Sequence, residues 1–170
     1  MIDFKNIVVT KPWGYEYLFY DNGIVSAWLL YIKAGMETSL HAHPHKTTGL
    51  VLLDGRVRVS FLNEGNELSD LDKRVIHPHV FHKTHAHVDS VILETETPID
   101  KLDIVRFKDA YGRDGEPYEG VAAMRERNLP HELMLTDAKV SRGTVGNTTI
   151  HALSFIDGNA FSRWVKNTMQ

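Results

Sequence analysis

Short β-rich segments separated by turn residues fill the chain from residue 8 to residue 107, and this pattern constrains the fold more than any other feature. The segments are rich in Val, Ile, Leu and aromatic residues, and turn residues recur between them at a spacing of about ten residues. Many short strands at such a spacing are typical of an all-β sandwich or barrel. The 170 residues therefore predict one all-β domain with a buried core.

Two neighbouring segments give more specific predictions. Residues 48–53 are almost continuously apolar, which predicts a strand buried on both faces. Residues 56–62 alternate between polar and apolar side chains, which predicts a strand with one solvent-facing side. Asp54 and Gly55 stand between them and are typical of a two-residue hairpin turn, so we expect these strands to pair.

The C-terminal part of the chain has a different pattern. Residues 119–128 predict a short helix, residues 148–155 a strand, and residues 159–166 a terminal helix capped by Asn159. We therefore expect a barrel over residues 1–115 and a short α-containing extension over residues 116–170. This extension is expected to pack on the barrel or at a dimer interface, because exposed barrel edges and apolar strands favour a homodimer.

Composition excludes several classes of partner and site. The formal net charge of −3 provides no basic field for nucleic acid or an anionic membrane surface. No apolar run approaches the roughly 18 residues of a membrane span. The absence of cysteine excludes disulfides and thiolate metal sites. The first residues lack the pattern of a signal peptide, so we expect a cytoplasmic protein.

Histidines gather in two clusters on strand-like sequence, between His41 and His87. Neutral imidazole is the commonest metal ligand in proteins. Residues two apart in a strand point to the same face, so His41 and His43 are expected to project together. His45 would follow them only if the strand continued through Pro44, which cannot donate to a sheet ladder. His45 is therefore a reserve ligand.

The second cluster contributes one further ligand. Pro78 marks a turn, and a strand that begins near Val80 places His82 on one face and His85 and His87 on the other. The sequence thus predicts a metal site built from His41 and His43 on one strand and His82 on another. The remaining histidines of the two clusters are predicted bystanders: His77, His79, His85 and His87.

Both clusters stand in patterns that resemble the two sequence motifs of the cupins. The first motif runs glycine, five residues, His-x-His, three or four residues, glutamate, six residues, glycine, and here it falls on Gly35, His41, His43, Thr48 and Gly55. Residues 76–82 resemble the second motif, with Pro78 as its proline and His82 as its histidine.

Four longer segments are similar to the cupin domain of type II mannose-6-phosphate isomerases: residues 11–14, 43–46, 82–83 and 103–113. The resemblance implies a jelly-roll barrel, also called a double-stranded β-helix. It also implies a divalent metal ion (Zn, Mn, Fe or Ni) held by the motif histidines. The implied chemistry is aldose–ketose isomerisation of a small carbohydrate, with the metal polarising sugar oxygens and a base moving a proton.

The sequence departs from the motifs at two positions. Thr48 stands where the first motif has its ligand glutamate, and His79 replaces a glycine of the second motif. The metal would then bind three histidines and water, or recruit His45, or bind weakly and leave a sugar-binding relic. Three neutral ligands leave the metal its full +2 charge, which favours an anionic substrate. His79 is expected to tolerate the turn that glycine makes there.

Three further side chains are candidates for catalysis. Glu94 lies in the middle of an apolar strand and is the candidate general base. Lys46 and Lys83 follow motif histidines and are candidates for phosphate contacts. Arg106 and Arg113 are expected to tie the closing segment to the barrel by ion pairs.

Three functions are consistent with these residues. The leading hypothesis is a metal-dependent isomerase or epimerase acting on a sugar, a sugar phosphate or a nucleotide sugar. The second is a three-histidine Fe(II) dioxygenase, which oxygen consumption with Fe(II) would separate from the first. The third is a non-catalytic sugar-binding or regulatory cupin, favoured by the loss of the glutamate and opposed by the three retained histidines.

Overall fold

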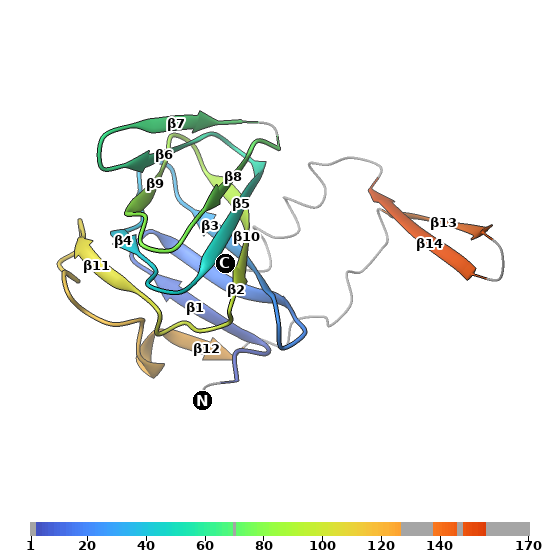
Figure 1. Cartoon of the computed structure of the whole chain (residues 1–170), viewed down its shortest axis with the longest axis horizontal. Helices are drawn as coiled ribbons and strands as arrows, with labels where there is room; N and C mark the ends of the chain where they lie inside the picture. Colours follow the sequence, from blue (N-terminus) through green and yellow to red (C-terminus); the bar gives the residue numbers. More distant parts are fainter. Residues whose placement is uncertain (1–2, 70, 127–137, 146–147, 156–170) are drawn as a thin grey trace.

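Two antiparallel β-sheets form a barrel in the computed structural model, which describes residues 3–69, 71–126, 138–145 and 148–155 (Figure 1). The larger sheet has the strand order β12-β1-β2-β3-β10-β5-β8. Its strands are, in that order, Met124–Glu126, Ile7–Lys11, Gly14–Asp21, Ser26–Ile32, Ser90–Thr97, Thr47–Asp54 and Lys73–Ile76.

The smaller barrel sheet has the strand order β11-β4-β9-β6-β7. Its strands are, in that order, Val105–Lys108, Leu40–Ala42, His82–Ala86, Val57–Phe61 and Gly65–Leu68. A third sheet consists of β13 (Ala138–Val145) and β14 (Thr148–Phe155), which pair with each other along their whole length. The strand predicted over residues 148–155 is thus confirmed, and the all-β jelly-roll fold is confirmed with it.

The predicted hairpin at Asp54 and Gly55 is wrong. β5 ends at Asp54 and pairs with β10 and β8, whereas β6 begins at Val57 and pairs with β7 and β9 in the other sheet. Gly55 has a φ of +100°, and a Cβ on it would come within 2.3 Å of Ser90 Oγ. The two residues therefore make a tight crossing between sheets, which a local sequence signal does not distinguish from a hairpin.

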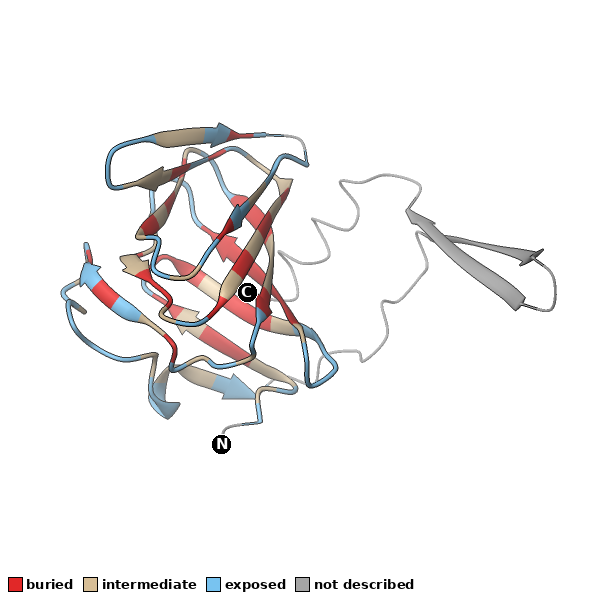
Figure 2. Ribbon diagram, viewed as in Figure 1, coloured by how far each residue is buried: buried red, intermediate tan, exposed pale blue. Residues whose placement is uncertain are grey.

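Side chains from both sheets fill the barrel, and Figure 2 shows the buried residues concentrated on its strands. Leu50 and Leu52 of β5 are buried, but the intervening Val51 is only half-buried. The strand predicted to be buried on both faces is therefore more deeply buried on one face than on the other. Complete burial is found in β3, from Ser26 to Ile32. Each large apolar side chain that is fully buried contributes roughly 1.5–3 kcal/mol to folding.

Of the helix predicted over residues 119–128, the structure describes residues 119–126, and these form no α-helix. A single 3-10 turn at Val121–Ala123 leads into β12, which pairs antiparallel with β1. Edge pairing with β1 has overridden a weak local preference for helix. The predicted helix over residues 159–166 lies outside the described residues. Within the described ranges, no helix has the length and apolar character needed to cross a membrane.

Candidate metal centre

Three histidines come together where β4 meets β9. His41 pairs directly with His82 across these two antiparallel strands, and directly opposed residues share a face of the sheet. His43 follows just after the end of β4. The ring centroids lie 4.4 Å apart for His41 and His82, 4.9 Å for His41 and His43, and 5.5 Å for His43 and His82. Each residue offers a ligand nitrogen, and these nitrogens all lie within 4.8 Å of one another.

Backbone carbonyl groups fix the orientation of all three rings. Nδ1 of His41 donates to Ser39 O at 2.7 Å, Nδ1 of His43 to Asp103 O at 2.6 Å, and Nδ1 of His82 to Val80 O at 3.0 Å. A carbonyl oxygen only accepts, so each Nδ1 carries the proton and each Nε2 keeps its lone pair.

The available nitrogens suit a cation. Nε2 of His43 is buried and has no hydrogen-bond partner in the described part of the chain. A buried polar atom without a partner is costly, and a metal ion bound there would remove this cost. Histidine ligands whose other nitrogen donates to a carbonyl are the usual arrangement in metal sites. The residues present therefore fit a divalent metal ion.

The surroundings keep the three imidazoles neutral. Burial, followed by repulsion from His82 and His43, lowers the pKa of His41 well below its usual value. Burial and the positive charge of Lys46 lower the pKa of His43 to about 4. Burial also lowers the pKa of His82. Only the neutral form binds a metal, so the group is prepared for binding at neutral pH.

His45, the reserve ligand, is not brought to this group. Its side chain is 79% exposed, and its Nδ1 contacts the carboxylate of Asp103 at 2.8 Å. Thr48 is buried, and its Oγ1 has no hydrogen-bond partner among the described residues. His79 adopts a φ of +67°, as expected for a position where the motif has glycine, and its N–H donates to His43 O at 2.8 Å.

A small cavity of about 60 Å³ opens beside His41 and His43 and is lined by Glu94, Glu96 and Lys46. Burial and the negative charge of Glu96 raise the pKa of Glu94 to about 7. No hydrogen bond or ion pair within the described ranges engages the Glu94 carboxylate. The sequence-based candidate for a general base thus lies in the same cavity as two of the histidines.

The two candidate lysines occupy different places. Lys46 is buried and its Nζ contacts Glu96 Oε1 at 3.1 Å inside the cavity. Lys83 lies on β9 next to His82 and therefore on the opposite face of the strand. Its Nζ pairs with Glu37 at 2.8 Å, and it does not line the cavity.

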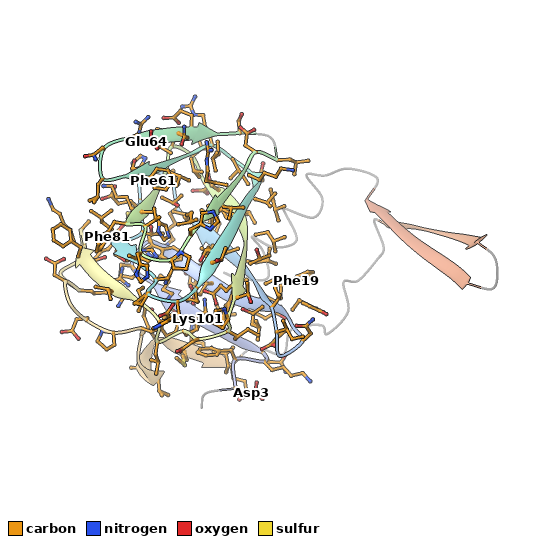
Figure 3. All side chains as sticks on the ribbon, in the orientation of Figure 1. Asp3, Phe19, Phe61, Glu64, Phe81 and Lys101 are labelled. Atoms are coloured by element: carbon orange, nitrogen blue, oxygen red, sulfur yellow. The ribbon has the colours of Figure 1, made fainter. Side chains whose placement is uncertain are left out.

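A network of buried ions at one end of the cavity was not predicted. Lys101, labelled in Figure 3, bridges Glu96 at 3.0 Å and Glu16 at 3.6 Å. Glu16 also binds Lys11 at 3.3 Å and accepts a hydrogen bond from Tyr118. Glu16 carries the same signal that marked Glu94, an acidic residue inside an apolar strand, so the sequence could have identified it as a candidate.

The closing segment is tied to the barrel as expected, through a carboxylate that the sequence did not single out. Arg106 and Arg113 both pair with Glu119, and Lys11 reaches the same carboxylate from β1. Arg113 also pairs with Asp109 at 2.8 Å. These ion pairs hold the segment after β11 against the cavity.

Comparison with known proteins identifies the fold. No family model matches the sequence, and no curated protein matches it. KdgF from Halomonas sp. is similar in structure, with a TM-score of 0.51, 20% identity, and coverage of 53% of this chain and 84% of that one. An RmlC-like cupin from Shewanella frigidimarina has a TM-score of 0.51 and 20% identity, and the match covers 55% and 85% of the two chains.

A third similar structure is CapF in complex with an inhibitor, with a TM-score of 0.52, 16% identity, and coverage of 60% of this chain and 34% of that one. At identities this low, the structural similarity establishes a shared fold and nothing finer. The resemblance to mannose-6-phosphate isomerases rests on the sequence segments alone. The barrel that carries the three histidines has the cupin fold.

Proposed function

We propose that this protein is a metal-dependent isomerase or epimerase that acts on a sugar or sugar derivative, such as a sugar phosphate or a nucleotide sugar. The observation that carries the proposal is the position of Glu94 in the cavity that His41 and His43 also line. Its carboxyl group has no hydrogen-bond or ion-pair partner among the described residues, and its pKa is raised to about 7. A general base works best when its pKa lies near the operating pH.

The proposed reaction is proton transfer at a carbon next to a carbonyl group. Glu94 removes the proton. Its return to the neighbouring carbon, with the hydroxyl proton passing between the two sugar oxygens, gives isomerisation. Delivery of a solvent proton to the opposite face of the original carbon gives epimerisation. Glu96 stays ionised between Lys46 and Lys101 and does not compete for the proton. A divalent ion held by the three imidazoles would supply Lewis-acid polarisation of a sugar oxygen.

The alternatives make different demands on the same residues. A three-histidine dioxygenase accounts for the neutral ligand set but gives no role to a carboxyl group with a pKa near 7. A non-catalytic sugar-binding cupin accounts for Thr48 in place of a ligand glutamate but likewise gives no role to Glu94. The Glu94 carboxyl group, with its pKa near 7, therefore favours proton transfer over both alternatives.

The test follows proton exchange directly. The metal would first be identified by elemental analysis of the purified protein. Sugar phosphates, nucleotide sugars and free sugars would then be incubated with the metal-loaded protein in D₂O, and NMR would detect deuterium entering the substrate. Glu94→Gln is expected to slow this exchange by about 10²–10⁴-fold. Its metal content should stay unchanged.

Glu64→Gln is the matched control, because Glu64 is exposed and does not line the cavity. Exchange by Glu94→Gln at the rate of the control would exclude Glu94 as the base. Oxygen uptake with Fe(II) and no deuterium exchange would favour the dioxygenase. Saturable sugar binding without either reaction would favour the binding protein.

A further inference from the structure

The three-histidine group contains no negative charge. The ligands are neutral imidazoles, and Thr48 offers only a hydroxyl group. Thr48 lies directly opposite Glu96 on neighbouring strands, so it faces the barrel interior, and its Oγ1 has no partner in the described part of the chain. A divalent cation held here would therefore keep its full +2 charge.

Lys46 adds a positive charge to the same place. Its side chain is only 2% exposed and lines the cavity together with His41 and His43. Asp103 ties it to the ligand group: the Asp103 carboxylate accepts the Lys46 backbone N–H at 2.8 Å, and the Asp103 carbonyl accepts the His43 Nδ1–H at 2.6 Å. Repulsion from a fixed ammonium group opposes the entry of a metal ion.

The carboxylates of the cavity do not cancel this charge. Glu96 pairs with Lys46 at 3.1 Å, but it also pairs with Lys101 at 3.0 Å. Five lysine and arginine side chains line the cavity against four glutamates, and one of the five, Arg113, also pairs with Asp109 outside the lining. One of the four is Glu94, whose raised pKa of about 7 leaves it partly protonated at neutral pH. The cavity lining thus has excess positive charge before a metal enters.

We propose that a divalent metal ion and a small oxyanion bind to this cavity cooperatively, and that Lys46 is the residue that makes metal binding depend on the anion. The inference rests on the proposed function, because the anion would be a carboxylate or phosphate group of the substrate. A negative group beside two cations relieves their mutual repulsion, so each ligand tightens the binding of the other by the same factor.

The experiment measures metal affinity and needs no turnover. Binding of Mn²⁺ and Ni²⁺ is measured by competition with a metal-sensitive dye in a chloride buffer, and then with added inorganic phosphate, D-glucuronate or uncharged D-glucose. We expect at least about tenfold tighter metal binding with one of the two anions and no change with glucose. The phosphate and glucuronate arms distinguish the two sources of the oxyanion.

Substitutions assign the effect to Lys46. Lys46→Met is expected to bind metal more tightly than the wild type without anion, and to lose the dependence on the anion. Lys46→Arg keeps the charge and should keep the dependence. Lys108→Met removes the same charge from an exposed position and should behave as the wild type. Thr48→Glu adds a negative charge on the face of the sheet that carries Glu96, and it serves as a second variant should Lys46→Met fail to fold, which circular dichroism would reveal.

The outcomes separate the two proposals. Equal metal affinity with and without both anions in the wild type would overturn cooperativity, while proton transfer by Glu94 would still be decided by deuterium exchange. An undiminished anion effect in folded Lys46→Met would overturn the role given to Lys46. An undiminished effect in Thr48→Glu would overturn the dependence of the effect on the positive charge of the site. A wild-type protein that binds no metal in any buffer would overturn both this proposal and the metal dependence of the proposed function.

Discussion

Glu94 and Glu96 stand two residues apart on the same face of β10, yet their surroundings drive the pKa values of their carboxyl groups in opposite directions. Burial and the charge of Glu96 raise the pKa of Glu94 to about 7. Burial acts in the same direction on Glu96, but the ammonium groups of Lys101 and Lys46 outweigh it and lower the pKa of Glu96 to about 2. Two carboxyl groups separated in this way divide the roles of proton carrier and fixed charge.

The first prediction concerns the pH dependence of catalysis. A base must be ionised to remove a proton, so the fraction of active enzyme should grow as the pH rises toward the Glu94 pKa of about 7. We expect kcat/KM for deuterium exchange to rise about tenfold per pH unit below that value and to level off above it. A profile that is flat across this range would contradict the assignment of Glu94.

The second prediction concerns stability. The pKa of Glu94 is about 7 in the folded protein against an ordinary value of 4.5, so the folded state binds this proton more tightly than the unfolded state. Ionisation of Glu94 therefore costs stability as the pH rises from 4.5 to about 7, and the full cost persists above it. Glutamine cannot ionise, so the gain in unfolding free energy from Glu94→Gln should be larger above pH 7 than below pH 4.5.

Urea denaturation of wild type and variant at both pH values measures this difference. Glu64→Gln, at an exposed position, is the control. A variant whose stability relative to the wild type is the same at both pH values would show that Glu94 titrates alike in the folded and unfolded chains.

Periodicity in the sequence was sufficient to predict the histidine group. The two-residue repeat of a strand placed His41 and His43 on one face and separated His82 from His85. The structure agrees, because His82 is buried in the group while His85 lies on the other face of β9. A different signal identified Glu94. Its position in the middle of an apolar run predicted that its side chain faces the cavity, and it lines the cavity.

Contacts between distant parts of the chain could not be predicted from local sequence patterns. Lys101 and Glu16 are 85 positions apart, and only the barrel brings them within 3.6 Å. The turn at Gly55 looks locally like a hairpin, although it carries the chain from one sheet to the other. Residues 119–126 do not form the predicted helix, because Glu119 pairs with Arg106 and β12 pairs with β1.

The third prediction concerns the metal ligands. His43→Ala and His82→Ala each remove one of three ligands, so the purified variants should lose their metal, as elemental analysis would show. His45→Ala and His85→Ala are the matched controls. The His45 side chain is 79% exposed, and His85 faces away from the group. Retention of metal by both His43→Ala and His82→Ala would exclude this group as the metal centre.

The last prediction concerns Glu119, the carboxylate that Lys11, Arg106 and Arg113 share. The Lys11, Arg106 and Glu119 side chains are each less than 10% exposed. Removing the carboxylate would leave Arg106 without a carboxylate partner among the described residues, and would leave Lys11 with Glu16 alone. We expect Glu119→Ala to lower the free energy of unfolding by about 3–5 kcal/mol, measured by urea denaturation. Glu67→Ala is the control, because Glu67 is half exposed and surface ion pairs contribute only about 0–1 kcal/mol. Equal losses in the two variants would mean that water reaches the three cations, and that the segment after β11 is not held to the cavity by Glu119.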